Sequence, residues 1–331
     1  MTETTRTREI PVEPQNAPPQ GDPDRRLRTF VKVGSILLVL CLIAFGGLYL
    51  KDQFVIGAPS IVDQQIQSAE AAVRQSPNNV AARLALAVAY EEKNRLDDAL
   101  AQYAEILKVD PGNMDGIMGK GRTLLTKGDL DAATAEYTKI VDAKKSGEFA
   151  GADTRLQASY YYLGLIALKQ GKPPLAIERL DQALQIEPTD SDAMYQIGLA
   201  QAQLGNHTGA IAMFKKALTF VPTGWCEPYQ QMQTSYTAGN APEEASYAAA
   251  MNLYCQQKPG QAKQQLTALT GGPAAVDAML GLALIAQVEK DNAGAVTWYQ
   301  KVLAADPKNI TAMSYLAALG VTPSPAATPK K

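Results

Sequence analysis

Residues 33–50, VGSILLVLCLIAFGGLYL, form a continuous apolar stretch without a charged side chain. As a helix, these residues would span roughly 27 Å, close to the hydrocarbon thickness of a bilayer, about 30 Å. A buried core helix is less consistent with the pattern because no polar face alternates with the apolar one. The stretch therefore predicts a transmembrane helix. The Pro-rich segments 1–32 and 321–331 show no apolar periodicity and are predicted to be disordered tails.

A cleaved signal peptide is the main alternative for the apolar stretch. Its length exceeds that of a typical signal-peptide apolar region, about 7–15 residues, and no A-x-A cleavage site follows it. A lipoprotein anchored through Cys41 is not favoured, because Leu40 stands where a small residue would be expected. We therefore expect an uncleaved membrane anchor.

Charges flanking the stretch predict its orientation. Arg25, Arg26, Arg28 and Lys32 precede it, whereas Lys51 stands alone on the other side. Positive residues favour the cytoplasmic side of a membrane. We expect a single-pass protein with a cytoplasmic N-terminus and with everything after residue 51 outside the cytoplasm.

Prolines, small residues and aromatic residues recur with a fixed period through residues 51–320. Pro77 and Pro111 are 34 residues apart, and so are Pro188 and Pro222. Between them, small residues and aromatic or leucine residues repeat in register: Ala87, Ala99 and Tyr103; Gly121, Ala133 and Tyr137; Gly164, Ala176 and Leu180; Gly198, Ala210 and Phe214; Ala283, Ala295 and Tyr299.

This pattern resembles the tetratricopeptide repeat, a helix–turn–helix unit of 34 residues, although the tryptophan of the ideal motif is missing from every unit. The resemblance implies an all-α fold, an α-solenoid in which helical hairpins stack into a right-handed superhelix. The expected units lie near 80–113, 114–147, 157–190, 191–224 and 276–309, with an irregular segment at 225–275 and a capping helix at 310–319.

Two departures from the period predict local irregularities. The units starting at 114 and 157 are separated by nine more residues than one period, which predicts a loop at 144–151. Later, we expect an unpaired helix at about 225–238 and an atypical repeat at 243–275, with Ala262, Leu266 and Leu269 on the buried face of its second helix. A leading helix is expected at 60–76.

Composition and charge argue against several functions. A net charge of −2 and a pI of about 5.6 are untypical of nucleic-acid binders. The single histidine, His207, lies in a predicted turn, and no catalytic or metal-binding motif is present. We therefore expect no enzymatic activity, no cofactor and no metal site.

Binding of a protein or peptide in the concave groove is the function that the resemblance implies. Groove positions of the family correspond to the first-helix residues of each unit, where tyrosine and glutamine recur. The expected peptide-binding residues are Met118, Arg122, Tyr161, Tyr162, Tyr195, Gln196, Tyr229, Gln230 and Gln233. Packing of these tyrosines on neighbouring hairpins is the alternative for the residues, and a self-associating structural oligomer is the alternative for the function. We expect a scaffold or adaptor at the outer face of the membrane, in envelope assembly or secretion.

A disulfide between Cys226 and Cys255 is also expected. The midpoint of the two cysteines falls within Gly239–Pro242, the predicted turn between two antiparallel helices, so the cysteines would face each other. Two separate buried thiols are the alternative. A compartment outside the cytoplasm would permit the bond.

Topology can be tested with a protease added to intact spheroplasts of a bacterial host. We expect degradation of the repeat region and protection of the first 30 residues, because the flanking charges place only the N-terminus inside. Immunoblotting with tags at each end of the chain measures both outcomes. Protection of the C-terminal tag would reverse the predicted orientation.

Overall fold

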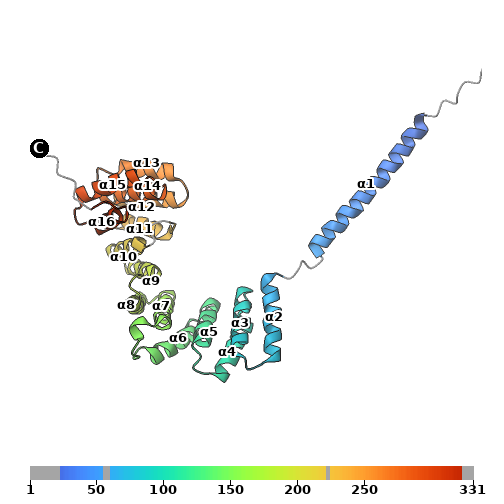
Figure 1. Cartoon of the computed structure of the whole chain (residues 1–331), viewed down its shortest axis with the longest axis horizontal. Helices are drawn as coiled ribbons and strands as arrows, with labels where there is room; N and C mark the ends of the chain where they lie inside the picture. The colour runs from blue at the N-terminus through green and yellow to red at the C-terminus, as the bar shows by residue number, and fades with distance from the viewer. Residues whose placement is uncertain (1–22, 55–59, 221–223, 323–331) are drawn as a thin grey trace, which may run out of the picture. The chain divides into compact units, whose positions relative to one another are not determined.

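The computed structural model describes residues 23–54, 60–220 and 224–322, and the predicted tails and Pro222 lie partly or wholly outside these residues. The chain divides into two units, Met1–Gln64 and Gln65–Lys331, each described by itself. The described residues form sixteen α-helices and one short 3-10 helix, and no strand (Figure 1). The helices are α1 (Pro23–Phe54), α2 (Ile61–Gln75), α3 (Val80–Glu92), α4 (Leu96–Val109), α5 (Met114–Lys127), α6 (Leu130–Lys144), η1 (Ala150–Ala152), α7 (Thr154–Lys169), α8 (Pro173–Ile186), α9 (Ser191–Gln203), α10 (His207–Phe220), α11 (Glu227–Ala238), α12 (Pro242–Cys255), α13 (Pro259–Ala268), α14 (Ala275–Val288), α15 (Asn292–Ala305) and α16 (Ile310–Ala318).

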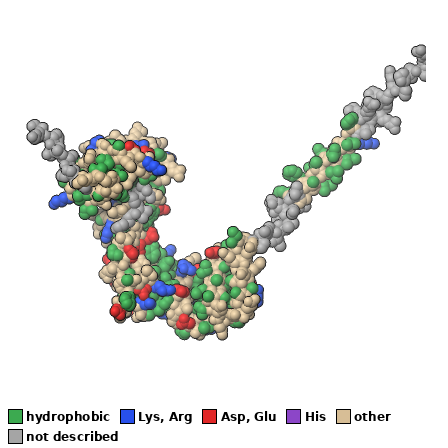
Figure 2. Space-filling view, in the orientation of Figure 1, with side chains coloured by type: hydrophobic (Ala, Val, Ile, Leu, Met, Phe, Trp, Pro, Cys, Tyr) green, Lys and Arg blue, Asp and Glu red, His purple; other side chains and the backbone are tan. Residues whose placement is uncertain are grey.

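Helix α1 forms most of the first unit and contains the apolar stretch. Its window Phe30–Gly47 is long and apolar enough to cross a membrane, and none of it is buried within the described structure. Hydrophobic side chains cover this part of α1 in the space-filling view (Figure 2). A signal sequence near the N-terminus meets the same criteria. Length and composition therefore fit both a membrane span and a signal sequence.

The second unit is built from antiparallel helix pairs that meet through small residues. The pairs α3–α4, α5–α6, α7–α8, α9–α10, α11–α12 and α14–α15 pack as hairpins, and each hairpin contacts the next element (Figure 1). At Gly164, a Cβ atom would lie 2.5 Å from Leu180 Cγ and 3.2 Å from the carbonyl oxygen of Ala176. Leu180 and Ala176 are fully buried. A side chain at residue 164 would therefore separate α7 from α8.

The turn inside each hairpin uses one residue in the left-handed backbone region. At each of these turns, a backbone N–H also bonds the carbonyl five residues earlier, as Arg95 does to Tyr90 at 2.8 Å. The left-handed residues are Asn94, Gly128, Gly171, Gly205, Asn240, Gln257 and Lys290. Glycine and asparagine adopt this conformation at low cost. The same turn also occurs outside the hairpins: Gln257 joins α12 to α13, and Gly320 follows α16, where the Val321 N–H bonds the Leu316 carbonyl at 2.9 Å.

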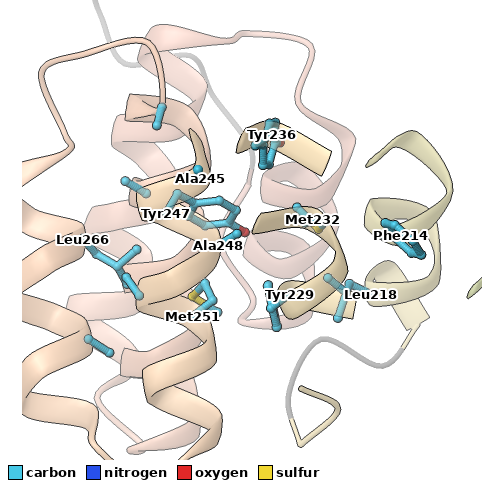
Figure 3. Close-up of a cluster of buried hydrophobic side chains, with 14 of the residues drawn as sticks. Phe214, Leu218, Tyr229, Met232, Tyr236, Ala245, Tyr247, Ala248, Met251 and Leu266 are labelled. Atoms are coloured by element: carbon cyan, nitrogen blue, oxygen red, sulfur yellow. The ribbon is translucent and has the colours of Figure 1, made fainter. Parts of the chain in front are cut away.

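The turn at Gln257 explains why the repeat pattern is irregular at residues 225–275. The structure here corrects one prediction. The expected unpaired helix at 225–238 is wrong, because α11 packs against both α10 and α12. Helix α13, of ten residues, is the additional element, packed between α12 and α14. Its Ala262 and Leu266 are fully buried, and Leu269 is half-buried. Figure 3 shows Leu266 beside Met251 and the ring of Tyr247 in this core.

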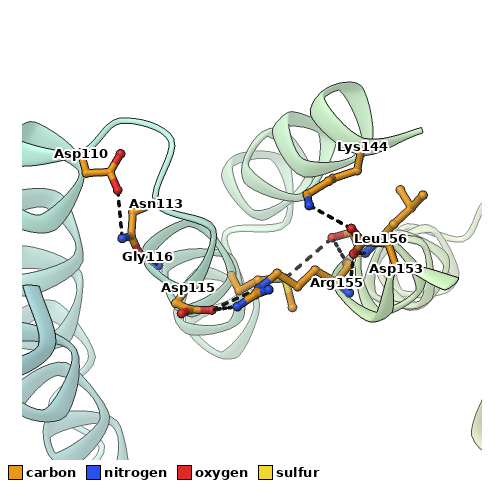
Figure 4. A network of polar contacts seen from close by, with 10 residues as sticks. Asp110, Asn113, Asp115, Gly116, Lys144, Asp153, Arg155 and Leu156 are labelled. Carbon is orange, nitrogen blue, oxygen red and sulfur yellow. Dashed lines mark hydrogen bonds and ion pairs between the residues drawn. The ribbon is translucent and has the colours of Figure 1, made fainter. Parts of the chain in front are cut away.

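Residues 145–153 form the connection where nine extra residues were expected. Asp153 accepts backbone hydrogen bonds from Arg155 and Leu156 and thereby caps α7. Its carboxylate also pairs with Lys144 at 2.9 Å, and Arg155 pairs with Asp115 at 2.9 Å (Figure 4). Burial alone would raise the pKa of Asp153, but the Lys144 ammonium and the backbone donors lower it. The insertion is thus tied to both flanking helices without disturbing the packing of α6 on α7.

Substitution of Gly164 tests whether close helix approach controls stability. We expect Gly164→Ala to lower the free energy of unfolding by about 1–2 kcal/mol, because overpacking outweighs the gain in helix propensity. Gly260→Ala in α13 is the matched control, since no atom lies within 4 Å of the added methyl group. This control should be neutral or stabilising by up to about 1 kcal/mol. Urea unfolding monitored by circular dichroism distinguishes the two, and equal effects would contradict the packing argument.

Candidate protein-binding groove

The three tyrosines of the expected ladder lie on α7, α9 and α11 but are not equivalent. Tyr161 and Tyr195 are half-buried, whereas Tyr229 exposes only 2% of its surface. The Tyr229 ring meets Tyr247 of α12 edge-on at 6.5 Å, and both are labelled in Figure 3. Burial raises the pKa of Tyr229 well above its ordinary value. Tyr229 is therefore packed in the core, as the alternative of tyrosines that pack on neighbouring helices expects, and its role in binding stays a prediction.

Aromatic neighbours hold the two remaining tyrosines. Tyr195 lies 5.6 Å from Phe214 and 5.1 Å from Trp225, measured between ring centres. Tyr161 meets Tyr162 nearly at right angles at 5.5 Å, and burial raises the pKa of Tyr161 to about 12. These contacts fix the rings, while their partial exposure leaves a face available to a partner.

The expected polar groove residues divide between solvent and internal contacts. Gln196 is half-buried and hydrogen-bonds the side chain of Tyr161. Gln230 is exposed, with its amide 3.4 Å from Asn252 Oδ1, and Gln233 is half-buried. Their amides can therefore serve as donors and acceptors for a peptide backbone.

The N-terminal group of expected residues clusters around α5 and α7. Met118, Tyr161 and Tyr162 pack against the same hydrophobic core. The Tyr162 ring stacks on Tyr137 at 4.9 Å, and Ser159 Oγ lies 3.7 Å from Met118 Sδ. The structure thus brings these three predicted residues together.

Arg122 is engaged by an internal carboxylate. Its guanidinium donates to Glu91 at 2.6 Å, and Glu91 also accepts from Tyr103 Oη at 3.3 Å and from the Thr123 hydroxyl. Burial opposes the charge of Arg122, but the Glu91 carboxylate raises the pKa of the guanidinium. Arg122 therefore connects α3 to α5, and a ligand would have to compete with Glu91 for its guanidinium.

A cavity of about 740 Å³ lies among α10, α11, α12, α14 and α16. Val276, Leu280 and Leu284 form a half-buried apolar strip along α14, at intervals of four residues. Tyr229 is the only member of the predicted site that lines this cavity. In the last unit, Leu280 occupies the repeat position that Tyr161 and Tyr195 hold in theirs. This equivalence is the feature of the sequence that could have predicted Leu280 as a binding residue.

Charged side chains of both signs line the cavity. Lys215 Nζ lies 2.6 Å from Asp277 Oδ2 and 6.0 Å from the centre of the Tyr236 ring. Burial by itself would lower the pKa of Lys215, but the Asp277 charge and hydrogen bond raise it. Lys216 also lines the cavity and is exposed. Asp306 lines the cavity as well, so the cavity combines an apolar wall with the Lys215–Asp277 pair and with one further side chain of each charge, Lys216 and Asp306.

Comparison with known sequences identifies the family. The sequence models of the tetratricopeptide repeat match residues 66–113, 92–148, 161–224 and 247–310. Together these matches cover more than half of the chain, which therefore belongs to the tetratricopeptide repeat family. Proteins of this family usually act as scaffolds without enzymatic activity.

Curated relatives match only parts of their own length. BBSome complex member BBS4 of Bos taurus is 26% identical over 161 residues, which are 49% of this chain and 29% of the relative. Cellulose synthase operon protein C of Escherichia coli K12 is 26% identical over 164 residues, 44% of this chain and 14% of the relative. The chain thus matches less than a third of either relative.

Two solved structures of other proteins are among those similar to this chain. The C-terminal part of a repeat-containing protein from Cytophaga hutchinsonii is 22% identical with a TM-score of 0.49, and the match covers 77% of this chain and 94% of that one. A crystal structure of MamA is 23% identical with a TM-score of 0.47, and the match covers 55% and 94% of the two chains.

Alanine substitutions distinguish core from groove tyrosines. Tyr229→Ala should lower the free energy of unfolding by about 3–5 kcal/mol, because a fully packed ring is removed. Tyr161→Ala should cost only about 1 kcal/mol, as expected for a half-buried side chain. Urea unfolding of both variants measures the difference. Equal losses would show that Tyr161 is as deeply packed as Tyr229.

Proposed function

We propose that the protein is a membrane-anchored scaffold that holds a partner protein in the groove of its repeat region, without catalysing a reaction. The cavity beside α14 carries this proposal, because it offers an apolar strip flanked by the Lys215–Asp277 pair and by Lys216. Pockets for ligands combine apolar walls with a few placed polar groups. A segment with apolar side chains at helical spacing would fit against Val276, Leu280 and Leu284.

The expected peptide-binding residues on α5, α7, α9 and α11 extend the proposed contact surface. Met118, Tyr161, Tyr162 and Tyr195 present half-buried faces of rings and a thioether. Gln196, Gln230 and Gln233 supply amides beside them, and Arg122 contributes where Glu91 leaves its guanidinium exposed. Aromatic and amide groups together suit a peptide backbone with apolar side chains.

The anchor and its orientation belong to the same proposal. The exposed apolar window Phe30–Gly47 supports attachment to a membrane. The basic residues Arg25, Arg26, Arg28 and Lys32 support a cytoplasmic N-terminus, which places the repeats at the outer face of a bacterial cell membrane. One relative is named as a member of a protein complex, which supports a role in holding proteins together, and a role in envelope assembly or secretion is part of the proposal.

Self-association is the competing function and is an outcome of the same experiment. The full-length protein is crosslinked in its own membrane, and captured proteins are identified by mass spectrometry. A different protein captured through the cavity supports the scaffold, whereas capture of copies of this chain alone supports a structural oligomer.

Paired substitutions on α14 test the cavity. Leu280→Glu should reduce partner capture at least tenfold, because a carboxylate would be buried against an apolar partner, a cost of more than about 1.4 kcal/mol. Val288→Glu is the matched control on the same helix, since Val288 is 53% exposed and lies outside the cavity lining. Melting by circular dichroism verifies that both variants are folded. Unchanged capture by a folded Leu280→Glu variant would exclude this cavity as the binding site.

A further inference from the structure

Cys226 and Cys255 occupy the adjoining ends of one helical hairpin. Cys226 is the N-cap residue of α11, and Cys255 is the last residue of α12. The two helices pack against each other and are joined by the short turn around Asn240. The start of α11 therefore lies beside the end of α12. Both cysteines are free thiols in the structure and are half-buried.

The two thiols are neighbours at this end of the hairpin, and Cys226 and the backbone of Gly224 are among the groups that act on the pKa of Cys255. Burial, together with the neighbouring Cys226, raises the pKa of Cys255 to about 12. Burial therefore disfavours the Cys255 thiolate, which is the form of a cysteine that attacks a disulfide.

We propose that Cys226 and Cys255 are an oxidisable pair that closes an intramolecular disulfide by exchange with a disulfide-bearing oxidant. Cys226 attacks the oxidant and releases one of its sulfurs as a thiol, which forms a mixed disulfide. Cys255 then attacks Cys226 Sγ, loses its proton and releases the second thiol. The pair gives up two electrons and two protons in total, and the oxidant disulfide is reduced to two thiols.

The disulfide would fix the groove where the repeat register changes. Trp225, next to Cys226, packs on Tyr195, and Tyr229, one turn into α11, lines the cavity. A bond from Cys226 to Cys255 therefore holds the start of α11, and with it Trp225, against α12. This inference is independent of the proposed partner, and an oxidising compartment would favour the bond.

Oxidation of the purified full-length chain in detergent tests the proposal. A Cys41→Ser background removes the third thiol. The protein is incubated with oxidised glutathione, the reaction is quenched in acid, and the remaining free thiols are alkylated. Mass spectrometry of the intact protein then counts the alkyl groups. We expect no alkylation after oxidation, two alkyl groups after reduction, and a melting temperature higher by about 5 °C in the oxidised form. Oxidant should not change the melting temperature of the double Cys→Ser variant.

Three variants make the result specific to this pair. Cys255→Ser should accumulate a glutathione adduct on Cys226 faster than Cys226→Ser does on Cys255, since burial disfavours the Cys255 thiolate. Cys255→Ser combined with Gln256→Cys keeps a thiol one residue away, on another face of the helix end, and should close at least tenfold more slowly. Full alkylation of the folded protein after oxidation, disulfides between chains instead of within one, or a lower melting temperature of the oxidised form would each overturn the proposal.

Discussion

Close approach of the two helices in each hairpin is the constraint on which the rest of the second unit depends. Gly164 and Gly198 leave space that Leu180 and Phe214 fill completely, so that the helix axes can come together. A hairpin packed in this way still has an apolar face, and only the next hairpin can cover it. Stability is therefore distributed along the stack, and the first and last helices must cover its ends.

The groove is what this stacking leaves uncovered. Residues that face a neighbouring hairpin are buried, while those between successive first helices remain half-exposed, as Tyr161 and Tyr195 do. Where α13 enters between α12 and α14, the spacing of first helices changes. The cavity lined by Leu280 and Tyr229 lies beside this change, so an irregularity in packing coincides with a recess of about 740 Å³.

Charged groups in the groove are mostly neutralised within the protein. Glu91 accepts from Arg122, and Asp277 pairs with Lys215. Each pair joins separate helices, so these charges hold elements together and their net field is small. Recognition in such a groove depends on shape, apolar contact and hydrogen bonds more than on long-range attraction of a charged partner.

Periodicity in the sequence was sufficient to predict the repeat family, the small residues at helix contacts and the apolar N-terminal stretch, because these features depend on local spacing alone. The position of the extra helix depended on tertiary structure, since the segments 225–238 and 259–268 each have the length and composition of a helix without a fixed partner. The same reason explains Tyr229: its register matches Tyr161 and Tyr195, but only the packing of α12 decides that Tyr247 covers it. The exposure of a side chain depends on residues that are distant in the sequence. The position of a residue within the repeat therefore cannot predict its burial where the neighbouring helices depart from the repeat.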